Sequence, residues 1–343
     1  MTRWRWPALL GVYLASRLAG LTALPMFLDE RIHLRWAQWI AQGRRLRLPF
    51  ISGRGLSVYL LAAVAPRASD PLLVGRLLTV AVGAVTLIAC HRLARRATRD
   101  TRVADVAALF YIACPFTLFY DRMVLTDAFL SCATALTLLL ALSVADDPRP
   151  RTGAALGGAI AMGVLSKTTG LLLFAVPLGV LALTAPPRRR AQGAIAAAYA
   201  VSLVLVAYPL WLFFRKTDEL AGAIGVRDNE ATFTGNAAAN LRLAGEWLWA
   251  YWTPTLALLG LLGLLLALVR GERRRVALLL AVCAAGPTVA FVAVSEIWYP
   301  RYLLFTTIPL LVLAAWGFVR AAEWAGGRTR LGPAAKAAAV AGA

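Results

Sequence analysis

Two carboxylates lie side by side where the first long apolar stretch of the chain ends. They are Asp29 and Glu30, in residues 28–33 (LDERIH). A third acid, Asp127, begins a later apolar stretch. A carboxylate within hydrogen-bond reach of a hydroxyl can take its proton, which is the work of a general base. These acids predict a reactive site at a membrane surface, with Asp29 as the sharpest candidate.

Cations recur in apolar surroundings. Arg17 and Arg76 lie within apolar stretches, Lys167 lies between two of them, and Arg301 comes just before the last one. Ionisable groups at such depth are costly and usually functional, although ion pairs that order the helices, or side chains that reach the interface, are the alternative for Arg17 and Arg76. Lys167 is one of three lysines in an arginine-rich chain. A compact ammonium suits a point contact to phosphate.

The composition predicts a polytopic membrane protein. Of the 343 residues, 60% are hydrophobic and 15% are charged, with a mean hydropathy of +0.69. No soluble core has this composition. Apolar runs predict an all-α protein with about ten transmembrane helices, at about 6–28, 71–91, 103–120, 127–145, 153–166, 169–184, 193–214, 252–270, 276–294 and 303–320. The first run is long and lacks a small-residue cleavage site, so we expect an uncleaved span.

The positions of Lys and Arg predict the orientation. Most of the net charge of +19 falls in connections that would face the cytoplasm if the N-terminus is inside. We therefore expect a multi-pass protein of the cell (inner) membrane, with both termini cytoplasmic and the carboxylates external. No basic face interleaved with stacking aromatics indicates nucleic-acid binding. The four cysteines form neither a disulfide framework nor a metal pattern.

Two external loops are large, at about 29–70 and 215–251. In the first, residues 31–42 have an amphipathic pattern and residues 56–64 are apolar but too short to span. Both predict helices at the interface. Arginines crowd this loop, which indicates either attachment to anionic headgroups or a site for a phosphate-bearing lipid substrate. Residues 1–320 are expected to form one transmembrane domain, and 321–343 a disordered, Ala/Gly-rich cytoplasmic tail.

Asp29 and Glu30 also have a structural interpretation. They would open the helix at 31–42, where capping and the helix dipole favour acids. Capping accounts for one acid at that position. It does not account for Asp127, Lys167 and Arg301 on the same predicted side of the membrane.

Four segments, taken in order, resemble the GT-C glycosyltransferase superfamily. The similarity is greatest to its branch of protein O-mannosyltransferases and lipid A aminoarabinose transferases, and it covers roughly residues 6–320. The segments are Asp29-Glu30, Arg122 to Asp127, Ser166-Lys167-Thr168-Thr169-Gly170 and Tyr299-Pro300-Arg301-Tyr302. The resemblance implies two membrane-lying helices in the first external loop. It also implies a polyprenyl-phosphate sugar as donor and a site on the external face.

The chemistry of such a transfer assigns expected roles to the residues. Asp29 would take the proton of the acceptor hydroxyl, and Glu30 or Asp127 would orient the acceptor or hold a divalent metal. A single displacement with one base implies inversion. Lys167, Arg301 and Arg54 would neutralise the phosphate. Three further residues are expected to contact the acceptor or to be structural, with the histidine as an additional metal candidate: Arg122, His33 and Arg76.

The chain departs from the family pattern in two places. Relatives often have a Lys-Pro-Pro-Leu-like run in the first loop, whereas residues 53–57 here are GRGLS, so Arg54 would replace the phosphate-binding lysine. Many relatives also carry further spans or a soluble C-terminal domain. That difference leaves the acceptor open, as protein, lipid or glycan, and is compatible with a partner subunit.

Two other functions compete with a transferase. A lipid-linked sugar flippase would place polar residues along a path through the bilayer and would have internal pseudo-symmetry. The ionisable residues here gather at one predicted face, and the halves of the chain show no obvious similarity. A non-catalytic subunit that keeps the fold is the third function.

Overall fold

The computed structural model describes residues 5–44, 46–183, 188–215, 237–271, 273–294 and 299–329. These residues form a helical protein, and no strand occurs among them. The predicted all-α polytopic class is confirmed. Two predictions concern residues outside these ranges: most of the second large loop, 216–236, and the end of the tail, 330–343.

The N-terminal part contains α1 (Arg5–Leu18), α2 (Leu28–Ala41), α3 (Leu48–Ile51), α4 (Gly55–Val64), α5 (Pro71–Thr98), α6 (Thr101–Ala113), α7 (Pro115–Tyr120) and α8 (Thr126–Asp146). The C-terminal part contains α9 (Pro150–Ser166), the 3-10 helix η1 (Thr168–Phe174), α10 (Ala175–Leu183), α11 (Arg188–Phe214), α13 (Ala237–Trp247), the π-helix η2 (Leu248–Trp252), α14 (Thr253–Arg270), α15 (Arg274–Val294), the 3-10 helix η3 (Pro300–Thr306) and α16 (Thr307–Thr329).

Six helical segments among the described residues are long and apolar enough to cross a membrane. They are Pro71–Thr98, Thr126–Asp146, Arg189–Leu212, Ala237–Arg270, Arg274–Ala293 and Pro300–Ala325. Every other predicted span also contains helix, but in shorter pieces. The predicted number of ten therefore stays a prediction.

Local breaks explain the shorter pieces. The first predicted span, 6–28, ends as helix at Leu18, because Gly20 adopts a φ of +59° that a helix cannot contain and Pro25 follows. The span predicted at 103–120 is split into α6 and α7 at Cys114, whose extended backbone precedes Pro115. At the other end, α16 continues to Thr329, beyond the predicted boundary at 320.

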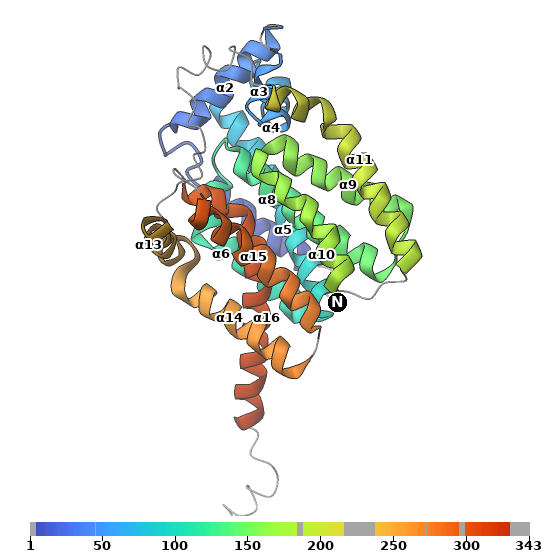
Figure 1. Ribbon diagram of the computed structural model, residues 1–343. Coiled ribbons are helices and arrows are strands. Elements are labelled where there is room, and N and C mark those ends of the chain that lie inside the picture. The colour runs from blue at the N-terminus through green and yellow to red at the C-terminus, as the bar shows by residue number, and fades with distance from the viewer. Residues whose placement is uncertain are drawn as a thin grey trace, which may run out of the picture.

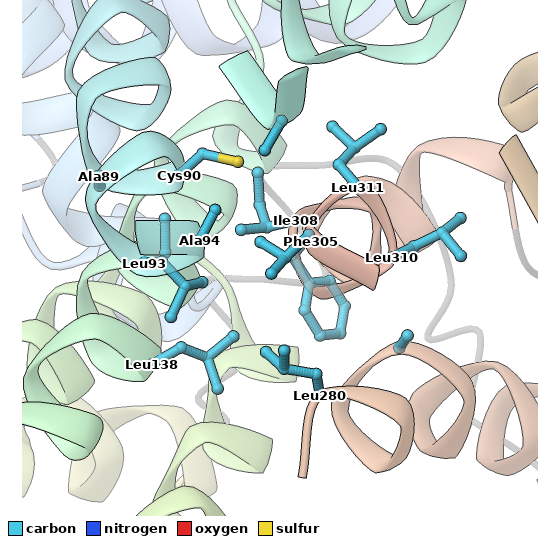
Figure 2. Packing of buried hydrophobic residues seen from close by; sticks show 14 of the residues in the cluster. Ala89, Cys90, Leu93, Ala94, Leu138, Leu280, Phe305, Ile308, Leu310 and Leu311 are labelled. Carbon is cyan, nitrogen blue, oxygen red and sulfur yellow. The ribbon is translucent and has the colours of Figure 1, made fainter. Parts of the chain in front are cut away.

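The core of the bundle lies where α5, α8, α15, η3 and α16 meet. Figure 2 shows Leu93 of α5, Leu138 of α8 and Leu280 of α15 directed toward Phe305 and Ile308. The apolar window of Pro300–Ala325 is 89% buried, which is the highest share among the six segments. Of these six segments, η3 and α16 thus form the most buried one.

Glycines let helices approach closely, as is common in membranes. A Cβ on Gly153 of α9 would lie 1.9 Å from the Ala194 carbonyl oxygen of α11, and one on Gly263 of α14 would lie 2.0 Å from the Leu313 oxygen of α16. These contacts hold α9 against α11 and α14 against α16.

The helices α2, α3 and α4 gather at one end of the bundle, opposite the end of α16 (Figure 1). The helices predicted at 31–42 and 56–64 are present as α2 and α4. Trp36 and Ala37 of α2 pack against Val58 and Leu61 of α4 and against Val124, while Arg31 and Arg35 on the other face of α2 are exposed. The helices α2 and α4 therefore form a lobe at the end of the bundle where α5 and α8 begin.

Candidate functional site

Four charged side chains from four separate parts of the chain meet at this end. Arg301 Nη2 lies 2.6 Å from Asp29 Oδ2, and its Nε lies 3.9 Å from Asp127 Oδ2. Lys167 Nζ lies 2.5 Å from Asp127 Oδ1. The structure thus brings together Asp29, Asp127, Lys167 and Arg301, which the sequence predicts to share a site. We call these four residues the charge cluster.

Helix ends position the charge cluster. Asp29 lies in the first turn of α2 and Asp127 in the first turn of α8, where the helix dipole stabilises a carboxylate. Lys167 is the extended residue between α9 and η1, at the predicted turn. Arg301 follows Pro300 at the start of η3. Each charge therefore lies at an element terminus, close to the boundary of an apolar segment.

Aromatic rings surround the cations of the charge cluster. Lys167 Nζ lies 3.7 Å from the centre of the Tyr302 ring, and Arg301 Cζ lies 4.7 Å from that of Tyr299. The face of an aromatic ring attracts a cation, and this attraction is stronger where water is excluded. Tyr302 is a residue that the sequence prediction missed as a site residue, although it stands in one of the four segments.

Lys167 is mostly buried, and Asp127 is the carboxylate beside it. Burial lowers the pKa of Lys167 to about 8, although Asp127 favours the charged form. At neutral pH the ammonium is protonated, but a modest rise in pH removes its charge. An anion that replaced Asp127 beside Lys167 would again favour the protonated form.

Glu30 is placed differently from its neighbour Asp29. Its side chain is completely buried and forms two hydrogen bonds with Arg76, from Nε to Oε1 at 2.9 Å and from Nη2 to Oε2 at 2.7 Å. The backbone N–H of Phe27 donates to Oε2 at 2.9 Å, so this carboxylate also caps α2. Arg76 further donates to the carbonyls of Leu21, Leu24 and Pro25. The pair fastens α5 to the chain between α1 and α2.

The backbone of Val124 is held from both sides by α2. Its N–H donates to Glu30 Oε1 at 2.9 Å, and His33 Nδ1 lies 2.8 Å from its carbonyl oxygen. A carbonyl only accepts hydrogen bonds, so Nδ1 carries the proton and Nε2 is free to accept. Because Val124 comes three residues before Asp127, α2 fixes the entry of the chain into α8.

His33 also connects to Arg54. Its Nε2 lies 3.4 Å from Arg54 Nη1, and the guanidinium stacks over Trp36 at 5.8 Å from the ring centre. Burial and the nearby Arg54 lower the pKa of His33 to about 4, which keeps the ring neutral and able to accept this bond. Arg54 is therefore positioned by α2 and by its own loop.

The loop of Arg54 contacts the turn of Lys167. Gly53 has a φ of +67°, and a Cβ there would lie 2.5 Å from Thr168 Cγ2. A glycine is required for both reasons. The structure thus brings Arg54 to the side of the charge cluster, and the charges of both Arg54 and Arg301 act on Lys167.

Arg122 lies away from the charge cluster. Its Nη2 donates to the carbonyls of Ala19 and Gly20, at 2.6 and 2.7 Å, and so holds the turn after α1. The neighbouring Asp121 is buried and was missed by the sequence prediction. It accepts from Tyr111 at 2.9 Å and lies 3.7 Å from Arg17 Nη2. This pairing accounts for the buried charge of Arg17.

The residues predicted as metal candidates make a poor set of ligands. Asp127 is paired with Lys167, Glu30 with Arg76, and both ring nitrogens of His33 have partners. Among the described residues no group of three or more His, Cys, Asp or Glu side chains is placed to hold a metal ion. Basic side chains already occupy the places where a divalent ion would bind, so these residues do not fit a metal ion.

An apolar cavity of about 240 Å³ lies between helices that lead away from the charge cluster. Its lining includes Thr134 of α8, Leu172 of η1 and Phe305 of η3. These residues lie one to two turns farther along the elements that carry Asp127, Lys167 and Tyr302. The cavity also borders α15 through Val282 and Pro287. A polar site and an apolar space are thus built from the same three elements.

The fold is similar to that of solved membrane glycosyltransferases. The structure of ArnT from Cupriavidus metallidurans bound to undecaprenyl phosphate aligns with a TM-score of 0.69 and 19% identity, over 93% of this chain and 61% of that one. The oligosaccharyltransferase AglB from Archaeoglobus fulgidus, in complex with an inhibitory peptide and a dolichol-phosphate, aligns with a TM-score of 0.66 and 13% identity, over 96% and 53%. The chain therefore spans about half to three fifths of the length of these structures. No match to the chain was found among curated protein sequences.

The sequence itself matches a family model. Residues 56–213, from α4 to α11, match the model described as dolichyl-phosphate-mannose-protein mannosyltransferase. This range contains Arg76, Arg122, Asp127 and Lys167, whereas Asp29 and Arg301 lie on either side of it. The chain therefore shares the fold of these solved structures, and its residues 56–213, a little under half of the 343, are similar to the dolichyl-phosphate-mannose-protein mannosyltransferase family.

Proposed function

We propose that this protein is an inverting glycosyltransferase that moves a sugar from a polyprenyl-phosphate carrier to a hydroxyl acceptor on the external face of the membrane. The observation that carries the proposal is the charge cluster, in which two carboxylates and two cations from four parts of the chain meet at one end of helices that also line an apolar cavity. A base and a phosphate site are the two parts that such a transfer needs.

The donor would bind through its phosphate and its lipid. Lys167 and Arg301, with Arg54 beside them, offer ammonium and guanidinium groups to the phosphate oxygens. The cavity lined by Leu172 and Phe305 would take the first part of the apolar chain. Phosphate binding would replace the ion pair between Arg301 and Asp29 with a pair to the donor, which frees Asp29, while Asp127 stays between Lys167 and Arg301.

The transfer is a single displacement at the anomeric carbon. The bond from this carbon to the phosphate oxygen breaks, and a bond to the acceptor oxygen forms on the opposite face, so the configuration inverts. The acceptor proton moves to Asp29, which is the more exposed of the two acids, at 18% against 4% for Asp127. The leaving phosphate gains one negative charge, which Lys167 and Arg301 stabilise. Asp127 orients both cations and the acceptor.

The remaining predicted residues would act through others. Glu30 and Arg76 lock α2 to α5, His33 positions Arg54, and Arg122 holds the turn after α1. None of them needs to touch the substrate. In this assignment Glu30 is a positioning residue and Asp29 the catalytic base.

The test compares membranes of a deletion strain that carry the wild type, Asp29→Asn or Asp146→Asn. Asp146 pairs with Arg96 at the opposite end of α8 and serves as the matched control. Transfer of radiolabelled sugar from polyprenyl-phosphate sugars to endogenous acceptors should fall roughly 10²- to 10⁴-fold in D29N, which is the usual contribution of a general base. The control should keep its activity.

Wild-type transfer by D29N at a normal membrane level would refute the mechanism. Translocation of a lipid-linked sugar in proteoliposomes without acceptor, combined with no transfer by the wild type, would favour a flippase instead.

A further inference from the structure

Four aromatic side chains form a cluster beside the charge cluster. Phe116, Phe119 and Tyr120 belong to α7, and Tyr251 belongs to the π-helix η2. The ring centres of Phe116 and Tyr251 are 4.9 Å apart, those of Tyr120 and Tyr251 are 6.1 Å apart, and those of Phe119 and Tyr120 are 5.0 Å apart. We call these four residues the aromatic wall.

The aromatic wall lies against an element of the proposed reaction site, because α7 contacts η3, the helix that carries Arg301. The charges of both Arg301 and Asp127 also act on the Tyr120 hydroxyl, which interacts with Tyr251. The wall is reachable as well, because Phe119 is 40% exposed and Tyr251 is half-buried. Phe116, at 2% exposure, backs the other rings. A ring-shaped ligand could therefore lie on the wall and reach the charged groups.

An unusual backbone places Tyr251 in the wall. The π-helix Leu248–Trp252 is a rare form that is frequently found at functional sites. It is followed by Thr253, with φ +60° and ψ +146°, a conformation that is almost confined to glycine and is strained for a β-branched residue.

Two contacts fasten this segment. Trp252 Nε1 donates to Thr307 Oγ1 at 2.8 Å, and Cys114 Sγ donates to the Tyr251 carbonyl oxygen at 3.6 Å. The first links η2 to the start of α16, next to η3, and the second links it to the residue before α7. The surrounding structure thus holds Tyr251 in position although the backbone after it is strained.

The chemistry of the wall fits a sugar ring. One face of a pyranose or furanose presents C–H groups, which pack on the π face of an aromatic ring, while its hydroxyls point outward to polar partners. Here the wall itself carries the phenol groups of Tyr120 and Tyr251, and the charges of Asp127 and Arg301 act on the first of them. A lipid chain would not use these polar neighbours. We propose that the aromatic wall is a sugar-binding subsite, with Tyr251, Tyr120 and Phe119 stacking against the ring.

This inference rests on the proposed function, because a transferase handles a sugar on its donor and, for a glycan acceptor, a second one. The shared ligand chemistry is a sugar ring. Binding can be measured without any transfer, so the subsite and the reaction can be tested separately.

The experiment measures saturation transfer by nuclear magnetic resonance from the purified full chain in detergent to methyl glycosides of mannose, glucose, galactose and arabinose. The wild type should saturate the ring C–H protons of at least one of them. Tyr251→Ala should weaken this binding by about 3- to 10-fold, the range that follows from one aromatic contact. Tyr251→Phe should retain it, since the ring remains.

Two further variants separate a local effect from a folding effect. Phe119→Ala removes an exposed ring and should weaken binding while the thermal unfolding midpoint stays unchanged. Tyr208→Ala removes a comparably exposed ring from the Tyr208–Trp211 pair on α11 and should bind sugar as the wild type does. Absence of saturation transfer for all four glycosides, or equal binding by wild type, Y251A and F119A, would overturn the inference.

Competition distinguishes the two sources of the sugar. A short-chain prenyl-phosphate sugar that displaces the glycoside, when prenyl phosphate alone does not, assigns the wall to the donor sugar. If the glycoside stays bound while the prenyl-phosphate sugar also binds, the wall is assigned to a sugar of the acceptor. Sugar binding at the wall by a protein that transfers nothing would contradict the proposed function and leave the subsite standing.

Discussion

Asp29 and Glu30 are neighbours in the chain, yet their side chains do different things. Asp29 faces Arg301 in the charge cluster, while Glu30 is enclosed by Arg76 and the N–H groups of Phe27 and Val124. A buried charge that loses its partner is very unfavourable, whereas a partly exposed one can be rehydrated. A substitution of Glu30 should therefore affect mainly stability, and a substitution of Asp29 mainly catalysis.

We expect Glu30→Gln to lower the free energy of unfolding by about 3 to 5 kcal/mol, because Arg76 is left buried without a countercharge. Asp29→Asn should leave stability nearly unchanged. Thermal unfolding in detergent measures both. The double variant Glu30→Gln/Arg76→Met should recover part of the loss. A single E30Q variant as stable as the wild type would show that the pair does not hold α2.

Lys167 gives a prediction for pH. Its pKa in the folded protein is about 8, so the value of kcat/KM for the donor should fall as the pH rises through that value. Lys167→Arg should move this limit upward, since arginine keeps its proton. A wild-type profile that stays flat to pH 9.5 would contradict the role of Lys167.

Stability should show the opposite trend over the same pH range. The unfolded chain binds a proton at Lys167 up to its ordinary pKa of about 10.4, whereas the folded chain releases it near 8. Since the unfolded state then binds more protons, the contribution of Lys167 to folding stability rises with pH between these values. If the fall in kcat/KM were accompanied by unfolding, it would therefore have a cause other than the loss of the Lys167 charge.

At the scale of elements, the turn from α9 into η1 decides where Lys167 lies. A Cβ on Gly170 of η1 would lie 2.3 Å from the carbonyl carbon and oxygen of Gly163 in α9. The two elements touch through their backbones, so neither has a flexible side chain that could move aside.

Gly170→Ala should therefore push η1 away from α9, lower the unfolding midpoint and weaken donor binding. Gly158→Ala is the control on α9, because a Cβ there meets nothing within 4 Å. An alanine within a helix is favoured over glycine by about 0.5 to 1 kcal/mol, so this control should be as stable as the wild type or more so. Equal behaviour of the two variants would exclude the close approach as the reason for the turn.

Much of the fold could be predicted from the sequence because hydrophobic length and periodicity are local signals. The helices at 31–42 and 56–64 and the turn at Lys167 are present within a few residues of their predicted limits. The end of α1 was missed because a left-handed Gly20 and Pro25 interrupt a stretch that stays apolar. The strained Thr253 leaves no trace in composition.

Partners distant in sequence were harder to predict than the residues themselves. The sequence predicts the four residues of the charge cluster, because isolated acids and cations stand out in an apolar chain. Nothing local shows that Arg76 binds Glu30, 46 residues away, or that Asp121 rather than an external group neutralises Arg17. Such pairings follow from helix packing, which the periodicity of one segment does not determine.

At the scale of the whole molecule, the charged residues at the two ends of the bundle are arranged differently. The end with α2 and α4 carries the charge cluster, while the opposite end carries ion pairs such as Arg96–Asp146 and Arg102–Asp100 and the arginines around Gly271. Positive charge accumulates in cytoplasmic connections. The proposed orientation therefore places the charge cluster outside.

Single cysteines test this orientation. Ser69→Cys lies just before α5 at the charge-cluster end, and Asp147→Cys lies just after α8 at the other. Both positions are exposed, whereas three of the four native cysteines are buried. A membrane-impermeant maleimide added to intact cells should label the first and reach the second only after lysis. The reverse pattern would invert the topology.

The charges around the site also match the proposed reaction in number. Lys167, Arg301 and Arg54 outnumber Asp29 and Asp127 by one positive charge, and a sugar joined to a lipid phosphodiester carries one negative charge. After transfer, Asp29 holds a proton and the lipid phosphate carries nearly two negative charges. The loaded site is then close to neutral both before and after the reaction, so neither substrate nor product leaves an uncompensated charge at the edge of the hydrocarbon.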